Sequence, residues 1–322
     1  MKKILAILLA VLMVFALCAC GGGNGTTAST PSSFNFTTGG DQGTYYGFGG
    51  VLAQKISAKT GTKVTAITSG GSKANIEALE KNDAQFGFVQ SDVMAYGFDG
   101  LRLFSAPVST YSTVAALYME QVQIVTLNPD IKTVADLAGK SVSIGDQGSG
   151  VYFNAIDVLG AYGLSEDDIV PQYLSFGDSA DSLQDGKIDA AFVVAGAPTT
   201  AVTSLAATHD VYLVSLDDAH IDTLIAESPY YSKYVIPAET YGMPEDATTV
   251  AVGAVVIARD DVPEQDVYNF VSGIFENVDE LKQAHDKANE LDLDFAASVT
   301  SVPYHPGAAK YFSEKGFSVA TK

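Results

Sequence analysis

Short apolar runs alternate with amphipathic stretches along the chain from residue 34 onward. In the first third, the apolar runs predict strands at residues 34–36, 64–68 and 86–89. Helical spacing follows two of these runs, at residues 44–59 and 73–81, and Ser91 is placed to cap a third helix. This repetition of strand, turn and helix predicts a parallel sheet covered by helices.

The rest of the chain repeats the pattern without a clear internal sequence repeat. Strands are predicted at residues 122–127, 141–144, 190–194, 211–215 and 250–258. Helices are predicted at residues 133–137 and 151–162, within 267–290 as one or two helices, and after Tyr304.

The N-terminus has the layout of an export signal. Lys2 and Lys3 precede an apolar run at residues 4–17, and the segment closes with Leu17-Cys18-Ala19-Cys20, which resembles a bacterial lipobox. We therefore expect a signal peptide at residues 1–19 and lipid on Cys20. A transmembrane helix is the alternative, but the run is shorter than the roughly 20 residues that span a bilayer. Residues 20–33 are rich in Gly, Ser and Thr and are expected to form a flexible tether.

Composition fits an exported, acidic body of two lobes. The 322 residues carry a formal net charge of −20, and loss of Lys2 and Lys3 with the signal makes this about −22. Cys20 is then the only cysteine left, which excludes a disulfide or thiol chemistry in the body. Such an acidic chain, with Arg102 and Arg259 as its only arginines, is not expected to bind nucleic acid.

Three glycine-rich turns are the candidates for a ligand-binding site. They occupy residues 39–46, 69–75 and 145–150, each after a predicted strand and before a predicted helix. Free N–H groups and the positive end of the helix dipole gather at such helix starts, and glycine lets a ligand approach the backbone. Ordinary capped turns are the alternative for any one of them. Three turns at the carboxyl ends of strands favour a site for an anionic ligand.

Nucleotide and enzyme motifs are weak or absent. Residues 47–50 lack the third glycine of GxGxxG, and no GxxxxGK[ST] occurs. No histidine has the partner spacing of a zinc site, and Ser149 is not in a GxSxG motif. Residues 292–294 begin like a calcium loop that Phe295 and Ala296 do not continue. We therefore expect no enzyme activity, no metal and no cofactor.

Several motifs together resemble one family. TGGDQGTYYGFGG at 38–50, SGGSKAN at 69–75 and DAQFGFVQSD at 83–92 are similar to the N-terminal signatures of TAXI-type solute receptors of TRAP transporters. The similarity continues through residues 141–152, 174–198 and the end of the chain from His305, and covers about 34–317. Val151 stands where that family more usually has threonine, and this chain lacks the tryptophan common near Gly196.

The resemblance implies an α/β, type II periplasmic-binding-protein fold. Two α/β lobes would face a ligand cleft, with lobe one at residues 34–118 plus 252–322 and lobe two at 119–251. Two hinge strands would cross near residues 117–123 and 248–253. Closure of the hinge would bring the ligand contacts of both lobes together.

We expect the ligand-binding residues in the glycine-rich turns and beside them. They are Gly43, Thr44, Tyr45, Gly71, Ser72, Asn75, Gln90 and Asp92 on one wall, and Gly148, Ser149, Gly150, Tyr152, Gly196 and Pro198 on the other. The alternatives are structural: inward packing for Tyr152, helix capping for Asp92 and loop support for Asn75.

Similar receptors imply a small carboxylate or an acidic amino acid as ligand, with glutamate or glutamine favoured. They also imply a TRAP membrane permease as partner, with this chain held by lipid on the outer face of the cell membrane. A surface lipoprotein whose cleft serves sensing or adhesion is the alternative.

Overall fold

The computed structural model describes residues 32–322, which form one compact unit. The predicted signal peptide, Cys20 and nearly all of the predicted tether lie outside the described residues. Within residues 32–322, no helix combines the length and apolar character that a membrane crossing needs.

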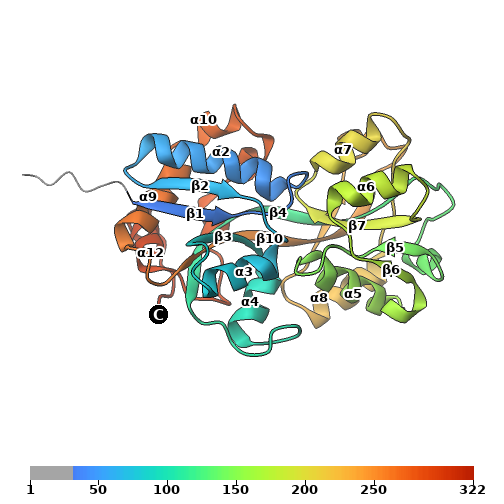
Figure 1. The fold of residues 1–322 in the computed structure, drawn as a ribbon, viewed down its shortest axis with the longest axis horizontal. Coiled ribbons are helices and arrows are strands. Elements are labelled where there is room, and N and C mark those ends of the chain that lie inside the picture. The colour runs from blue at the N-terminus through green and yellow to red at the C-terminus, as the bar shows by residue number, and fades with distance from the viewer. Residues whose placement is uncertain (1–31) are drawn as a thin grey trace, which may run out of the picture. The chain divides into compact units, whose positions relative to one another are not determined.

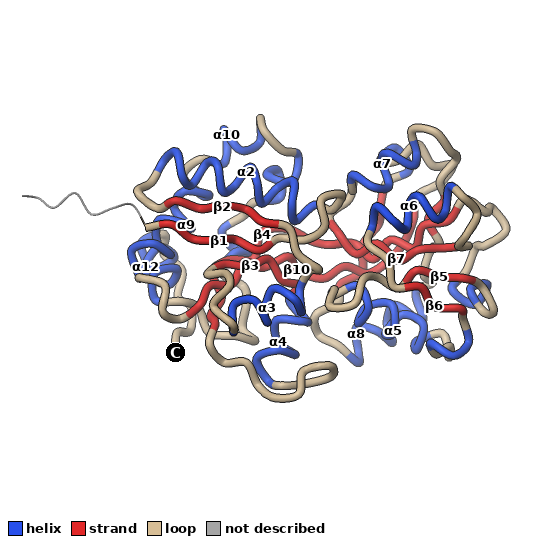
Figure 2. Tube along the Cα trace, in the orientation of Figure 1, coloured by secondary structure: helices blue, strands red, loops and turns tan. Residues whose placement is uncertain are grey.

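One mixed sheet runs through the whole unit, with helices on both of its faces (Figures 1 and 2). Its main strand order is β2-β1-β3-β10-β4-β7-β5-β6, with β8 paired to β4 and β9 paired to β10. The strands are β1 Ser33–Thr37, β2 Lys63–Ile67, β3 Phe86–Gln90, β4 Tyr111–Thr126, β5 Ser141–Ser143, β6 Val170–Gln172, β7 Ala190–Ala195, β8 Tyr212–Leu213, β9 Ser232–Ile236 and β10 Ala247–Arg259.

The expectation of a parallel sheet is only partly correct. Strands β1, β2 and β3 are parallel, as are β5, β6 and β7. The long strands β4 and β10 are antiparallel to each other, and they are also antiparallel to β7 and β3 respectively. Strand β4 takes the chain from the first group of parallel strands to the second, and β10 takes it back. Because each is antiparallel to its neighbours, β4 runs in the same direction as β3, and β10 runs in the same direction as β7.

Strands β4 and β10 join two lobes. The second half of β10 pairs with β3 on one side and with the first half of β4 on the other, whereas the second half of β4 pairs with β7 and the first half of β10 pairs with β9. We call β1–β3 with their helices lobe one, and β5–β9 with theirs lobe two. Both strands are continuous through the crossing, so the residue numbers predicted for the lobe boundaries stay a prediction.

Each lobe has an apolar core on both faces of its sheet. In lobe one, α2 (Thr44–Lys59), α9 (Glu264–Phe275) and α12 (Pro306–Glu314) cover one face. Helices α3 (Ser72–Glu80) and α4 (Ser91–Asp99) cover the other face. Figure 1 shows α10 beside α2, and residues of α9 and α12 share an apolar core with α2, so lobe one is built from both ends of the chain.

Lobe two is built in the same way. Helices α5 (Val151–Ala161) and α8 (Asp218–Glu227) cover one face, and α6 (Phe176–Gln184) and α7 (Thr200–Ala206) cover the other. The shorter elements are α10 Val278–Lys282, α11 Leu293–Ala296, and the 3-10 turns η1 Val134–Leu137, η2 Glu166–Asp168, η3 Ala238–Thr240 and η4 Asp286–Glu290.

Candidate functional site

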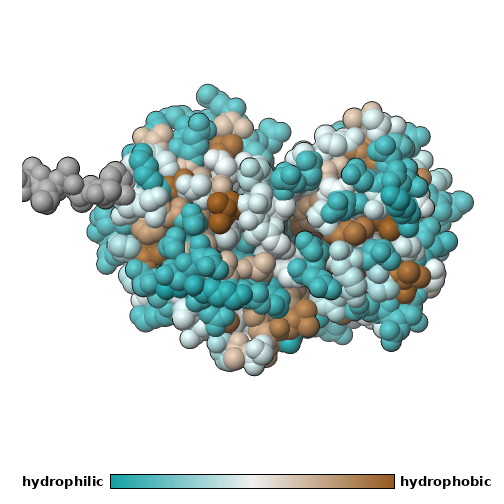
Figure 3. Space-filling model, in the orientation of Figure 1, coloured by the Kyte–Doolittle hydropathy of each residue, from teal (hydrophilic) through white to brown (hydrophobic). Residues whose placement is uncertain are grey.

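A cavity lies between the two lobes at the carboxyl ends of the parallel strands. It encloses about 580 Å³, open solvent at its mouth included, which is within the usual range of small-molecule sites. Figure 3 shows a notch between the lobes at the upper edge of this face. Its lining residues are Gly39, Gly40, Gly43, Thr44, Tyr45, Ser69, Gly70, Gly71, Ser72, Gln90, Glu120, Asp146, Ser149, Gly150, Val151, Leu174, Ser175, Phe176, Val194 and Ala195.

Three helix N-termini converge on this cavity. Helices α2, α3 and α5 begin at Thr44, Ser72 and Val151, each of which lines it. In none of the three does the N-cap residue supply a side-chain hydrogen bond, because each of these caps is a glycine. The first N–H groups of the helices and their dipoles are therefore directed toward the cavity, which favours a negatively charged group there.

Contacts across the cavity hold the lobes together. The N–H of Ala74 in α3 donates to the carbonyl of Gly148 at 3.1 Å, and the Thr44 hydroxyl donates to the carbonyl of Gly196 at 2.7 Å. Arg102, which follows α4, forms an ion pair with Asp157 of α5 at 2.5 Å. These bonds join lobe one to lobe two, so the structure is the closed form of a two-lobed cleft.

Close packing at the lobe interface explains one of the glycines. A Cβ on Gly150 would lie 1.4 Å from Gln90 Oε1 and 3.0 Å from Ser72 Oγ. In lobe one, Gln90 is nearly fully buried at the end of β3, and its Nε2 donates to Asn154 Oδ1 of lobe two at 2.9 Å. Only a residue without a side chain lets the start of α5 approach β3 this closely.

A buried carboxyl lies at the floor of the cavity. Glu120 is on β4 where the strand crosses between the lobes, and Tyr45 donates its hydroxyl to Glu120 Oε2 at 2.8 Å. Burial raises the pKa of Glu120 to about 8, although the Tyr45 hydrogen bond and the charge of Lys287 act in the opposite direction. The Tyr45 ring stacks on Phe88 with its centroid 4.6 Å away, which fixes the direction of the hydroxyl.

Eight of the predicted ligand residues line the cavity, and six do not. The eight are Gly43, Thr44, Tyr45, Gly71, Ser72, Gln90, Ser149 and Gly150. Contact with a ligand stays a prediction for all of them. Two of these residues have buried oxygens without a hydrogen-bond partner, Gln90 Oε1 and Ser149 Oγ, so they are free to bond a ligand.

Asn75 and Asp92 lie behind the cavity wall. The Asn75 amide donates to the carbonyls of Thr38 and Phe88 at 2.7 and 2.6 Å, so it ties two strand ends together. Asp92 is fully buried and accepts from Asn154 Nδ2 at 2.9 Å. Burial raises the pKa of Asp92 to about 6. These contacts differ from the alternatives expected from the sequence, which were helix capping for Asp92 and support of the neighbouring Gly-Gly loop for Asn75.

The other four lie on the lobe two side. Gly148 and Tyr152 line a separate surface groove, where the Tyr152 hydroxyl donates to Glu166 at 2.9 Å. Gly196 accepts the Thr44 bond across the lobe interface. Pro198 follows a cis peptide bond and lines a different groove beside His285.

Sequence reasoning missed the floor and the apolar wall of the cavity. Glu120 had a signal, because it interrupts a strand that is otherwise largely apolar. Phe176 follows the capping residue Ser175, and nothing in its local sequence separates it from an ordinary helix residue. No lysine, arginine or histidine is among the described residues that line the cavity, and residues 32–322 contain no cluster of three or more potential metal ligands.

Comparisons with known proteins agree with this fold. The chain matches the NMT1-like family over residues 36–316. MatC from Rhodopseudomonas palustris with bound malate is 11% identical, with a TM-score of 0.58 over 88% of this chain and 97% of that one. The GluR0 ligand-binding core from Nostoc punctiforme, in complex with L-glutamate, is 14% identical, with a TM-score of 0.50 over 80% and 99%. A protein from Bordetella bronchiseptica RB50 is 15% identical, with a TM-score of 0.54 over 88% and 89%.

These findings confirm two predictions, the resemblance to TAXI-type receptors and the type II periplasmic-binding-protein fold.

Proposed function

Since this chain belongs to the NMT1-like family of TAXI-type substrate-binding proteins, we propose that it is the lipid-anchored receptor of a TRAP-type secondary transporter. The chain is a solute-binding protein of the periplasmic-binding type and not an enzyme. In the proposal, it captures a small carboxylate or an amino acid of the glutamate or glutamine kind. The closed receptor then delivers the ligand to a membrane permease.

The observation that carries the proposal is the meeting of three helix N-termini from two lobes. Helices α2 and α3 belong to lobe one and α5 belongs to lobe two, and their first residues share one cavity. A carboxylate placed there receives N–H groups from both lobes only when the cleft is closed. The malate bound to MatC and the L-glutamate bound to GluR0 are small carboxylates, which supports this ligand class.

Anchoring by Cys20 completes the proposed receptor. A lipidated Cys20 followed by residues 21–33 as tether would keep the body near its permease, on the outer face of the membrane. A Cys20→Ala variant expressed in the source cell is expected to leave the membrane fraction. An unchanged membrane fraction, or no lipid on the wild-type cysteine by mass spectrometry, would refute the anchor.

Ligand capture is tested by thermal-shift screening of residues 32–322 against amino acids and small carboxylates. A ligand at 100 times its dissociation constant adds about 2.7 kcal/mol to the free energy of unfolding, a shift of several degrees at most. Ser149→Ala should remove the shift, because its hydroxyl is buried in the cavity without a partner. Ser313→Ala, exposed on α12, is the matched control and should keep the shift.

A well-folded protein that responds to no compound of this panel would argue against the proposed ligand class. The same thermal shift in wild type and Ser149→Ala would argue against this cavity as the binding site.

A further inference from the structure

The cavity has opposite electrostatic character at two places. The starts of α2, α3 and α5 favour negative charge, whereas the floor carries the carboxyl of Glu120. We propose that Glu120 binds the ammonium group of the ligand and thereby selects amino acids over carboxylates that lack an amine. This rests on the proposed function and narrows its ligand class.

Glu120 is placed to accept a hydrogen bond from a donor group of the ligand. It is 2% exposed and lines the cavity, so its contacts with a ligand are shielded from bulk water. The Tyr45 hydroxyl holds Oε2 at 2.8 Å, and within residues 32–322 no hydrogen bond occupies Oε1. One oxygen is therefore fixed by the protein, and the other is left for a ligand.

A second unpaired acceptor belongs to Gln90, which also lines the cavity. Gln90 is 2% exposed, and its Oε1 is buried without a partner. Asn154 accepts from Gln90 Nε2, so the amide presents its oxygen and not its nitrogen as the free atom. An ammonium group has three donors and no acceptor, and it matches two free oxygens in a cavity that lacks basic side chains among the described residues.

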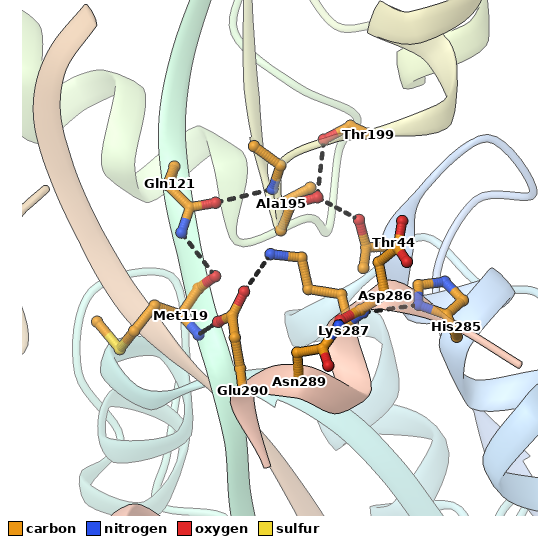
Figure 4. A network of polar contacts seen from close by, with 12 residues as sticks. Thr44, Met119, Gln121, Ala195, Thr199, His285, Asp286, Lys287, Asn289 and Glu290 are labelled. Carbon is orange, nitrogen blue, oxygen red and sulfur yellow. Dashed lines mark hydrogen bonds and ion pairs between the residues drawn. The ribbon is translucent and has the colours of Figure 1, made fainter. Parts of the chain in front are cut away.

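The nearest lysine is already paired. Lys287 is 4% exposed, and its Nζ binds Glu290 Oε1 at 2.5 Å (Figure 4). The same Nζ lies over the Tyr118 ring. It packs against Gly196 behind the cavity and does not line it. The charge of Lys287 therefore lowers the pKa of Glu120, but its ammonium group does not occupy the place in the cavity that a ligand ammonium would take.

The titratable groups around Glu120 predict a proton signal on binding. They are Tyr45 of α2, Tyr118 of β4, Asp92 of α4, and Lys287 and Glu290 of η4. Burial keeps the unligated carboxyl protonated at neutral pH, since its pKa is raised to about 8. An arriving ammonium favours the carboxylate, so Glu120 releases its proton to water as the ion pair forms. A ligand carboxylate at the same place would accept a hydrogen bond from the protonated Glu120, and no proton would leave.

Isothermal titration calorimetry of residues 32–322 at pH 7 tests the proposal. The probes are L-glutamate and L-glutamine, each beside its amine-free counterpart, glutarate and glutaramate. Titrations in phosphate and in Tris, which differ in ionisation enthalpy, give the number of protons released. We expect the amino acids to bind about tenfold or more tightly than their counterparts, with release of up to one proton per ligand.

Two variants keep the test independent of folding. Glu120→Gln keeps the shape of the side chain and should weaken amino-acid binding about tenfold or more while abolishing proton release. Tyr45→Phe removes only the hydrogen bond to Oε2 and should change the number of protons released with a smaller loss of affinity. Glu227→Gln, exposed on α8, is the matched control and should behave as wild type.

The outcomes separate this inference from the proposed function. Equal binding of glutarate and glutamate, or amino-acid binding by Glu120→Gln at wild-type affinity, overturns the role of Glu120 and leaves the receptor function standing. Binding of no compound in either series overturns both. Tight binding of the amino acids without proton release also contradicts the ion pair with Glu120.

Discussion

Replacing Gly150 by alanine should prevent complete closure of the cleft while leaving both lobes folded. The added Cβ would lie 1.4 Å from Gln90 Oε1 and 2.4 Å from Gln90 Cδ. Gly150 has φ −74° and ψ −22°, an ordinary helical conformation for any residue. The substitution therefore causes no backbone strain, and its cost is confined to the contact between the lobes.

The size of the effect follows from what Gln90 must give up. Moving its side chain breaks the 2.9 Å bond to Asn154 and leaves a buried polar atom unpaired, at about 1–3 kcal/mol. Overpacking at a tight contact adds about 1–3 kcal/mol. Neither cost applies to the open form, so a net loss of about 3 kcal/mol should weaken ligand binding about a hundredfold.

Two assays check this prediction. Calorimetry measures the affinity, and spin labels on Lys81→Cys and Lys187→Cys report the distance between the lobes. Those two lysine side chains are 65% and 70% exposed, and residues 32–322 contain no other cysteine. Gly160→Ala is the matched control. Gly160 lies in the same helix, α5, and a Cβ there would meet no atom within 4 Å. Wild-type affinity and a wild-type closed distance in Gly150→Ala would refute the closed-form interpretation.

Three further changes have distinct expected results. Arg102→Met removes the ion pair with Asp157 across the lobes and should speed ligand release several-fold, about 1 kcal/mol, measured by stopped-flow displacement; an unchanged rate at low salt would contradict a role in closure. In the wild type, the free energy of unfolding should fall as pH rises from about 4 to 6, and Asp92→Asn should abolish this fall. The wild-type carboxyl keeps its proton up to a pKa of about 6 when folded but only to about 3.8 when unfolded; equal slopes in both proteins by urea titration would count against this. Phe270→Ala removes a ring stacked 4.4 Å from Phe86 and should cost about 3–5 kcal/mol in chemical denaturation without changing ligand affinity; a parallel loss of affinity would show that the lobe one core shapes the site.

The sequence predicted elements well where local signals were complete. Helix α2 begins at Thr44 and ends at Lys59 as expected, because glycines precede it and Thr60-Gly61 ends its apolar spacing. Strand β4 begins at Tyr111, whereas a strand was expected only from residue 122. Its side chains are buried on both faces, so the alternation that reveals a half-exposed strand is missing.

In the candidate site, too, local features were predictable from the sequence and contacts between distant residues were not. The helix starts at Thr44, Ser72 and Val151 were predictable because a glycine turn and a helical pattern meet there. Glu120 joins Tyr45 across 75 residues, and such a contact depends on the crossing of β4 and not on local sequence. Asn75 and Asp92 lie in the first turns of α3 and α4, where ligand-binding residues often occur. The sequence does not reveal that the Asn75 amide bonds backbone carbonyls or that the Asp92 carboxyl bonds Asn154.

The arrangement of β10 has a consequence for how the chain folds during the export that we propose for it. Strand β3 completes its pairing only with β10, through Gln90 with Ala254 and Phe86 with Ala258, and the core of lobe one also needs α9 and α12. Most of lobe two is one uninterrupted stretch between β4 and β10, so it has nearly all of its partners before the last third of the chain arrives. A chain that emerges N-terminus first therefore exposes the apolar edge of β3 until its final segment is out. We expect late, slow formation of lobe one and a need for protection of this edge during export.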